Sequence, residues 1–381
     1  MKNFLFVFVA FLLVPNTVFS KDIEDAGAST TLPATLLQVY QNNPTLKASQ
    51  AELQSTYELY PQALAGWRPS LNAEAGIYKS DIENSNFDGA ADGATTKTIS
   101  LNLDQPLYRG GITRSETSRA KHLIEANYAK MRQTQQAVFL RTVSAYMNVI
   151  RDRQLLALSQ NNESLLGKEL DATKERFKGG ELTKTDMNQA EARFAQAGAE
   201  TANAWNNLEA SDATFEQIVG VKPQAGMEVP EPSFPFPSSI DAMTSEAELN
   251  SPNLSQSESQ RAAAEKQIDS FRGELWPQVS AYASYVKEYD PQPGIIDDSR
   301  TATVGVRAKF ALYQAGVVQS RVRQAKSQAA QRTMEIEETR RALRQDIDSQ
   351  HKKLGSLERQ IDLRKKEIDS KNESLAGVRE E

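Results

Sequence analysis

The sequence predicts an α+β fold in which a unit of long antiparallel coiled-coil helices and β-hairpins occurs twice. Apolar and polar residues alternate in Thr98–Leu103 and again in Thr303–Phe310, which is the periodicity of a strand. A glycine-containing corner follows each strand, and a proline-free helical stretch follows each corner. The first such stretch spans Ile112–Lys178, and at the helical rise it is roughly 100 Å long. A short strand followed by a very long helix, twice in one chain, therefore defines the fold class.

The composition excludes several classes of site. The chain has 381 residues, no cysteine, two histidines and a formal net charge of −6. Disulfides, thiolate metal sites and a cysteine nucleophile are excluded, and a nucleic-acid partner is not expected from this charge. No phosphate loop, zinc spacing or nucleophile–histidine arrangement occurs, so we expect no enzyme, no metal and no cofactor.

The N-terminus has the pattern of an export signal over residues 1–20. Lys2 supplies the positive charge, and an apolar run from Phe4 to Val14 follows it. Val18-Phe19-Ser20 then resembles a cleavage site. The alternative is a buried core helix. We expect an exported mature chain that begins near Lys21.

The first repeat is predicted over residues 21–220. A helix over 32–66 is broken at Asn42–Pro44. Strands are expected at about 69–82 and 97–108, with a loop over 84–96 and a corner at Gln105–Gly111. The long helix Ile112–Lys178 stops at Gly179-Gly180, and a return helix spans Thr183–Val219.

A proline-rich linker over 221–239 separates the first repeat from a second repeat over 240–381. The second repeat has expected strands at about 277–289 and 300–313, a corner at 311–316 and a second long helix. Apolar residues in that helix recur at every seventh position, which predicts a partner helix in a left-handed supercoil: Ile347, Leu354, Ile361, Ile368 and Leu375.

Short matches between the halves support the duplication. They lie about 205 to 210 residues apart and in the same order. The matching segments are Asn43-Pro44-Thr45-Leu46 with Ser251-Pro252-Asn253-Leu254, Arg68-Pro69-Ser70-Leu71 with Trp276-Pro277-Gln278-Val279, Tyr108 and Gly111 with Tyr313 and Gly316, and Asn162-Glu163-Ser164-Leu165 with Asn372-Glu373-Ser374-Leu375.

The four expected strands have one polar and one apolar set of side chains, as membrane barrel strands do. A hairpin of a soluble protein has the same alternation. Four strands cannot close a barrel, so several chains must share one; two copies would give an eight-stranded barrel filled by side chains, and three would give twelve strands with room for a channel. The polar set assigned to the lumen is Ser100, Asn102, Asp104, Arg307 and Lys309, and the set assigned to lipid is Val304, Val306, Ala308 and Phe310.

Aromatic residues near the strand ends fit the same picture. Such residues form girdles at membrane interfaces, although ordinary strand aromatics are the alternative. The residues concerned are Trp67, Trp276, Tyr108 and Tyr313.

This arrangement resembles the TolC family of outer-membrane efflux and secretion channels. The resemblance covers most of the mature chain and is seen in four segments. They are Asn43-Pro44, Trp67-Arg68-Pro69-Ser70-Leu71, Gln105-Pro106-Leu107-Tyr108-Arg109-Gly110-Gly111, and the helix-tip turn from Arg176 through Phe177, Gly179, Gly180 and Asp186 to Met187.

The resemblance implies a homotrimer with a shared twelve-stranded barrel in outer-membrane lipid and a periplasmic α-helical barrel. Its tips would meet a periplasmic adaptor (membrane fusion) protein and an inner-membrane efflux pump or ABC exporter, in drug efflux or type I secretion. Gly180, Leu182 and Thr183 would contact the adaptor, and Asp186 would lie near the tunnel entrance. For Asp186 the alternative is an acid that favours a helix N-terminus.

In the family the second repeat also has a tip turn and a return helix. Here these would lie beyond Glu381, so we expect a C-terminally incomplete version of the design. The competing hypothesis from another class is a soluble periplasmic coiled-coil scaffold or adaptor. The strand segments discriminate between them, because a soluble protein would not partition with outer membranes.

Overall fold

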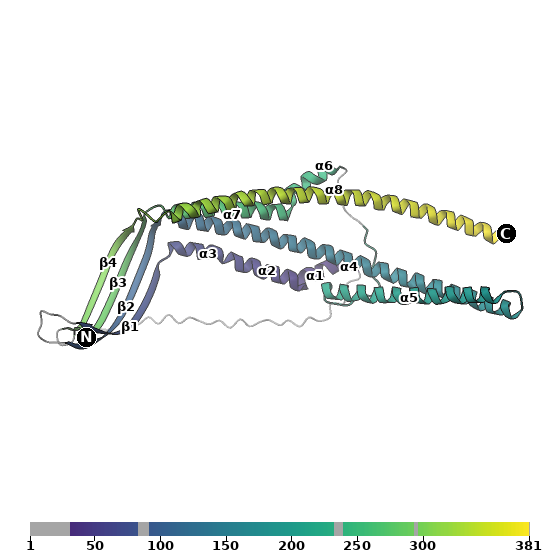
Figure 1. The fold of residues 1–381 in the computed structure, drawn as a ribbon, viewed down its shortest axis with the longest axis horizontal. Coiled ribbons are helices and arrows are strands. Elements are labelled where there is room, and N and C mark those ends of the chain that lie inside the picture. The colour runs from purple at the N-terminus through teal and green to yellow at the C-terminus, as the bar shows by residue number, and fades with distance from the viewer. Residues whose placement is uncertain (1–30, 83–90, 232–238, 293–295, 381) are drawn as a thin grey trace. The chain divides into compact units, whose positions relative to one another are not determined.

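The computed structural model describes residues 31–82, 91–231, 239–292 and 296–380 (Figure 1). The expected export signal over 1–20 lies outside the described residues. The chain forms two packing units, Asn42–Arg141 with Glu231–Glu381 and Met1–Gln41 with Thr142–Pro230. These units are not the sequence repeats, because the first repeat contributes to both.

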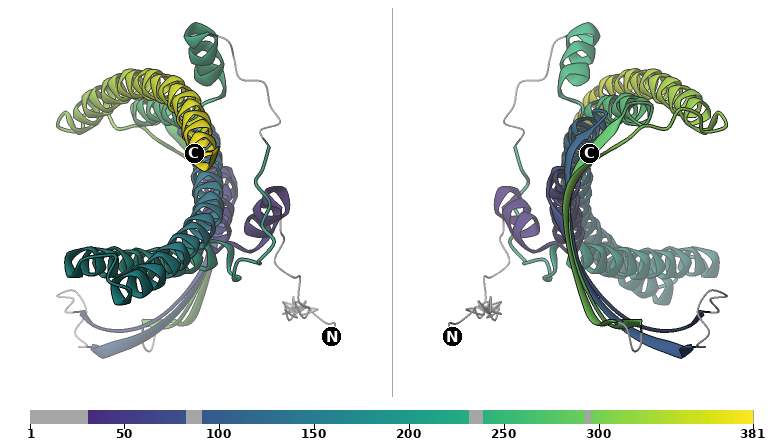
Figure 2. Two further views of the ribbon diagram at one scale, coloured as in Figure 1. Left: turned by 90° about the vertical axis from the view of Figure 1, so that its right-hand side faces the viewer. Right: turned by 90° about the vertical axis from the view of Figure 1, so that its left-hand side faces the viewer.

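The larger unit contains one antiparallel sheet of four strands in the order β1-β2-β3-β4. The strands are β1 (Ser70–Ile82), β2 (Ala91–Arg109), β3 (Gln278–Gln292) and β4 (Ile296–Lys309). Because β2 pairs with β3, the hairpins of the two sequence repeats join into a single sheet. The sheet is curved along the direction of its strands (Figure 2).

Two strand ends differ from the expectation. The loop predicted over 84–96 is wrong for residues 91–96, which belong to β2 because Thr95 and Thr96 pair with Lys79 and Tyr78 of β1. Residues 84–90 of that loop lie outside the described residues. Strand β4 ends at Lys309, before the expected 313. Its partner there is Gln278, and the preceding Pro277 has no N–H to continue the ladder.

The two strand-to-helix corners use left-handed backbone conformations. Strand β2 continues past an irregularity between Pro106 and Tyr108, and its turn is formed by Gly110 (φ 62°) and Gly111 (φ 84°). At the second corner Ala315 (φ 50°) and Gly316 (φ 77°) take the same places. Glycine adopts these angles without steric cost, which explains why glycines mark both corners in the sequence.

The helices of this unit confirm the expected break near Asn43. They are α2 (Pro44–Tyr57), α3 (Leu59–Leu64), the short 3₁₀ helix η1 (Ala65–Trp67), the start of α4 (Ile112–Lys178), α6 (Ile240–Asn250), α7 (Pro252–Gly273) and α8 (Val317–Glu380). The Asn43 side chain accepts hydrogen bonds from Thr45 and Leu46 and so caps α2, while Ser251 caps α7 through Leu254. The duplicated Asn-Pro and Ser-Pro signals are therefore matched helix starts.

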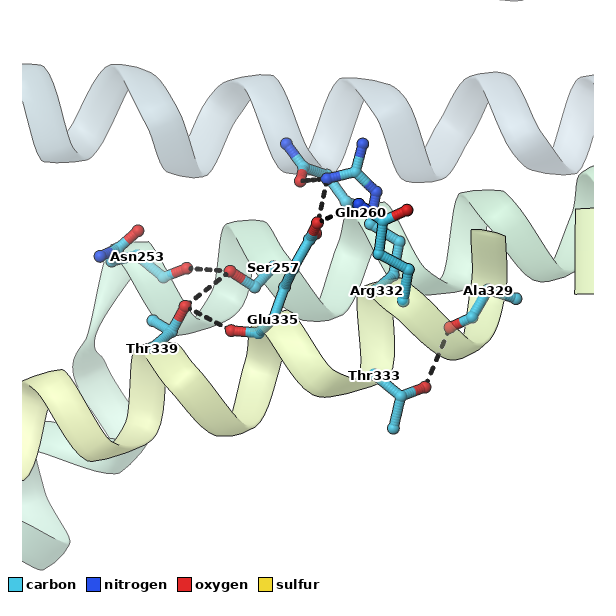
Figure 3. Close-up of polar contacts among 9 residues, drawn as sticks. Asn253, Ser257, Gln260, Ala329, Arg332, Thr333, Glu335 and Thr339 are labelled. Carbon is cyan, nitrogen blue, oxygen red and sulfur yellow. Dashed lines mark hydrogen bonds and ion pairs between the residues drawn. The ribbon is translucent and has the colours of Figure 1, made fainter. Parts of the chain in front are cut away.

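Polar side chains join α7 to α8 (Figure 3). The Arg332 guanidinium donates to Gln260 Oε1 at 3.3 Å and to Glu335 Oε2 at 2.7 Å. The hydroxyls of Ser257 and Thr339 lie 3.4 Å apart. Hydrogen bonds from Gln331 and then Arg332 lower the pKa of Glu335. These contacts fix the pairing of the two helices in the second repeat.

Farther along α8 the seven-residue apolar seam is exposed at Leu354, Ile361, Ile368 and Leu375. An exposed seam of this kind is stabilised when a partner helix covers it. The partner helix expected from the sequence stays a prediction.

The smaller unit packs α1 (Leu32–Asn42) with the second part of α4 and with α5 (Lys184–Val219). Its core includes Val39, Tyr146, Val149 and Phe215, and the rings of Tyr146 and Phe215 have centroids 6.5 Å apart. No helix among the described residues has an apolar stretch long enough to cross a membrane.

The start of the proline-rich linker is bonded to this core. The Tyr146 hydroxyl donates to the carbonyl of Glu228 at 2.8 Å, and burial raises the pKa of this tyrosine. The Arg153 guanidinium donates to the carbonyls of Pro223 and Gln224. Since prolines leave few N–H groups for pairing, side chains of α4 hold this segment through its carbonyl oxygens.

Candidate functional site

The sheet has a polar face made by all four strands. Residues directly opposite in antiparallel strands point to the same side. Across one row Asn72 lies opposite Asn102, Asn102 opposite Ser284, and Ser284 opposite Thr303. The neighbouring row on the same side begins with Ser70 and Asp104 and ends with Tyr282 and Gly305.

The structure brings the four charged or amide residues predicted for the lumen to this polar face. Asn102 and Asp104 lie on β2, and the alternation along β4 puts Arg307 and Lys309 on the same side. Asn102 Nδ2 donates to Ser100 Oγ at 3.3 Å. The salt bridges of the described residues include neither Asp104 nor Arg307, so both charges are available on this face.

The opposite face of the sheet is apolar and exposed. Val304 is 85% exposed and Val306 68%, with Leu71 and Ile77 of β1 similarly exposed. A contiguous exposed apolar surface on this scale requires a non-aqueous environment or a partner. Ala308 shares this side, which is the lipid face predicted from the sequence, and Phe310 follows just beyond the end of β4.

Tyr282 contacts several residues of the polar face. The alternation in the sequence did not predict this role. The Tyr282 ring covers Gly305, where an added Cβ would lie 2.8 Å from the tyrosine hydroxyl oxygen. The Arg307 guanidinium stacks over the same ring at 4.6 Å, which is a favourable cation–π distance. The signal in the sequence was the isolated Gly305 in a strand, since such a glycine marks a close approach.

The helix tip lies between α4 and α5. Gly180 has φ 78°, and its N–H donates to the carbonyl of Phe177, while the N–H of Glu181 donates to that of Arg176. Leu182 is half-buried and Thr183 is the N-cap of α5. The turn expected at Gly179-Gly180 is therefore confirmed as a glycine-closed helix end, and the three predicted tip residues are adjacent in it.

Asp186 takes part in a capping box at the start of α5. Its Oδ2 accepts from the Thr183 hydroxyl at 2.7 Å and from the Thr183 N–H at 2.9 Å, and its own N–H donates to Thr183 Oγ1 at 3.3 Å. The hydroxyl bond and then the backbone bond hold the pKa of this carboxyl below its usual range. The structure thus gives Asp186 a helix-starting role, and its place near the entrance stays a prediction.

The aromatic residues expected at an interface are exposed in this chain. Trp67, Tyr108, Trp276 and Tyr313 all keep a large fraction of their surface accessible. Trp67 precedes β1 and Trp276 precedes β3. Tyr108 lies at the C-terminal end of β2, and Tyr313 follows the end of β4. Because the strands are antiparallel, these positions lie at one end of the sheet, where an interface girdle would form.

Comparison with known proteins identifies the family. The family model for outer membrane efflux proteins matches residues 36–221 and 243–380. The outer membrane efflux protein BepC of Brucella suis is 28% identical over 357 residues, which cover 93% of this chain and 76% of the relative. The outer membrane protein TolC of Escherichia coli is 26% identical over 363 residues, with 90% and 72% covered.

Solved structures agree with this fold. The outer membrane channel CmeC of Campylobacter jejuni superposes with a TM-score of 0.71 at 16% identity, over 82% of this chain and 70% of that channel. The resemblance to the TolC family seen in the sequence is confirmed. The chain belongs to the outer membrane efflux protein family, whose members are outer-membrane channels with a periplasmic helical part.

Proposed function

We propose that three copies of this chain close one twelve-stranded barrel, with the polar sheet face toward the lumen and the apolar face toward lipid. The observation that supports this is a curved sheet with one polar and one apolar face, to which the described part of the chain contributes four strands. An open sheet edge is not tolerated in lipid, so the outer edges of β1 and β4 require strands from other copies. Twelve strands enclose a channel.

The channel would act by passage alone. Cargo would cross the barrel between the polar side chains of Asn102, Asp104, Arg307 and Lys309 without chemical change. A channel of this kind depends on partners that select and drive the cargo. These would be a periplasmic adaptor (membrane fusion) protein and an inner-membrane efflux pump or ABC exporter.

The tip would be the docking point for the adaptor. Gly180, Leu182 and Thr183 form a compact turn in which the N–H groups of Gly180 and Thr183 are hydrogen-bonded, which limits the conformations of the turn. Asp186 would place a negative charge beside this turn, at the tunnel entrance. Its lowered pKa keeps that charge present under mildly acidic conditions.

Ion selectivity tests the orientation of the sheet. In planar-bilayer recordings under a salt gradient, Asp104→Asn is expected to move the reversal potential toward anion selectivity, because it removes a lumen carboxylate. Arg307→Gln is expected to move it in the opposite direction. Lys287→Gln is the matched control, since Lys287 lies on the other face of the sheet, and it should leave the potential unchanged. A shift with Lys287→Gln alone would reverse the assignment of faces.

The capping box predicts how the stability of the tip depends on pH. A carboxyl whose pKa is lowered on folding stabilises the fold above its unfolded pKa, and the effect is lost as pH falls through the folded pKa. The first turn of α5 should therefore keep its protection in hydrogen exchange at neutral pH and lose it only when the pH falls below the ordinary carboxyl pKa of about 4.

Asp186→Ala should lower that protection at every pH, because the carboxylate that accepts from the Thr183 N–H and hydroxyl is absent. Glu191→Ala, at an exposed acidic position of the same helix, is the control and should exchange as the wild type does. Equal protection in Asp186→Ala and the wild type at neutral pH would contradict the capping role.

A further inference from the structure

A cavity of about 310 Å³ lies where β2 passes into α4. Its polar lining comes from Arg109 at the end of β2, Gln62 of α3, and Thr113, Glu116 and Arg119 of α4. All of these residues belong to one packing unit of one chain. The cavity is therefore formed without any contribution from a second copy.

The residues that line this cavity have a net positive charge. The Arg119 guanidinium pairs with Glu116 at 3.3 Å. Arg109, by contrast, is in none of the salt bridges found in the described parts of the chain. With two guanidinium groups and one carboxylate, the cavity has an excess of one positive charge. A half-enclosed unpaired arginine favours an anionic ligand.

The Arg109 guanidinium is held in place and keeps donors free. Its Nη1 donates to Thr113 Oγ1 at 3.3 Å, and Thr113 Oγ1 in turn lies 3.4 Å from the carbonyl of Gly66. An added Cβ on Gly66 would lie 2.6 Å from that nitrogen, so the glycine leaves the space that the guanidinium occupies. Of the five N–H donors of an arginine, one is used here, and the fork geometry suits phosphate oxygens.

A second cavity adjoins the first. It has a volume of about 400 Å³ and shares Arg119 and Leu123 with it. Its further lining is neutral in balance: Arg332 pairs with Glu335 at 2.7 Å, and the rest is mainly amide groups, namely Gln260, Gln267, Gln328 and Gln331. Amides donate and accept hydrogen bonds, so this part suits hydroxyl or ester groups attached to an anion.

We propose that these adjoining cavities bind a phosphate group, with Arg109 as its principal ligand and with Gln62 as a further polar partner. The phosphate would be that of an outer-membrane lipid headgroup or free inorganic phosphate. Arg109 lies opposite Gln278, which lies opposite Lys309, so it is on the polar side of the sheet that the proposed function assigns to the lumen. The register therefore favours free inorganic phosphate as the source, and a lipid headgroup is the competing outcome of the test. The lipid source rests on the proposed membrane position, whereas the phosphate chemistry does not.

Native mass spectrometry of the purified, delipidated full chain in detergent provides the test. Inorganic phosphate, phosphatidylglycerol and diacylglycerol are added separately, and bound molecules per protomer are counted over a titration. Arg109→Gln is expected to weaken phosphate-group binding by at least about tenfold, and Arg109→Lys by less, because lysine keeps the charge without the fork. Diacylglycerol, which lacks phosphate, should not bind at this site.

Arg323→Gln is the matched control, because Arg323 is an exposed arginine of α8 that lines neither cavity. Unchanged circular dichroism and elution volume establish that each variant is folded. If Arg109→Gln loses the binding of both phosphate and phosphatidylglycerol, the site is supported, and a phosphate group alone is sufficient for binding. Loss of phosphatidylglycerol binding only identifies the lipid headgroup as the ligand.

Two results would overturn the proposal. One is binding of both probes that Arg109→Gln leaves unchanged. The other is an equal loss in Arg323→Gln, which would mean nonspecific attraction to surface arginines. A failure of trimer assembly leaves this test intact, because the cavities lie within one chain, so it separates the phosphate site from the proposed channel.

Discussion

Gly273→Val is expected to remove the folded channel from the outer membrane. Gly273 ends α7, and an added Cβ would lie 2.5 Å from the Ile112 side chain and 2.9 Å from the carbonyl oxygen of Gly110. One of these neighbours is backbone, so the corner between β2 and α4 must move. We expect a destabilisation of about 3 kcal/mol. An unheated denaturing gel of outer-membrane fractions should show loss of the heat-modifiable, trimer-sized band.

Gly355→Val is the matched control for this substitution. Gly355 is also a helical glycine, but an added Cβ would meet nothing within 4 Å. The control therefore introduces the same side chain into a helix without a steric clash. Gly110→Ala should fail as Gly273→Val does, since its Cβ would lie 2.1 Å from the Gly273 carbonyl oxygen. A normal band for Gly273→Val, or equal loss with Gly355→Val, would refute this packing.

Val304→Arg is expected to block insertion into the membrane, whereas Thr303→Arg is expected to be tolerated. The two positions are adjacent on β4 but face opposite sides of the sheet, Val304 with Ala283 and Thr303 with Ser284. An arginine facing the lipid core of a barrel costs about 2–4 kcal/mol near the midplane, and a lumen position has little such cost. Thermal stability of the trimer in detergent and its yield in outer membranes measure the difference.

This pair contains its own control, because the substituted residue is the same in both variants and only the face differs. Val306→Arg should follow Val304→Arg, since Val306 lies on the same face. Equal yields for Val304→Arg and Thr303→Arg would mean that neither face contacts lipid. A lower yield for Thr303→Arg would mean that the faces are reversed.

Local patterns in the sequence determined most elements of this protein. The long helix over Ile112–Lys178 and the helix break near Asn43 lie where periodicity and capping residues predict them. The polar and apolar sets on β2 and β4 also follow from alternation alone. These features depend on neighbours close in the sequence, and a helix start or a strand face is decided by residues within a few positions.

The tertiary structure decided where elements meet. Strand β2 begins at Ala91 because β1 supplies a partner, and only the pairing register brings Asp104 opposite Tyr282, over whose ring Arg307 lies. The contact of Gly110 with Gly273 likewise joins glycines from different sequence repeats. The cavity around Arg109 likewise exists only because α3 and α4 pack beside the end of β2. Periodicity assigns a face to each residue, but strand register and side-chain packing decide which distant faces touch, and no local pattern contains that information.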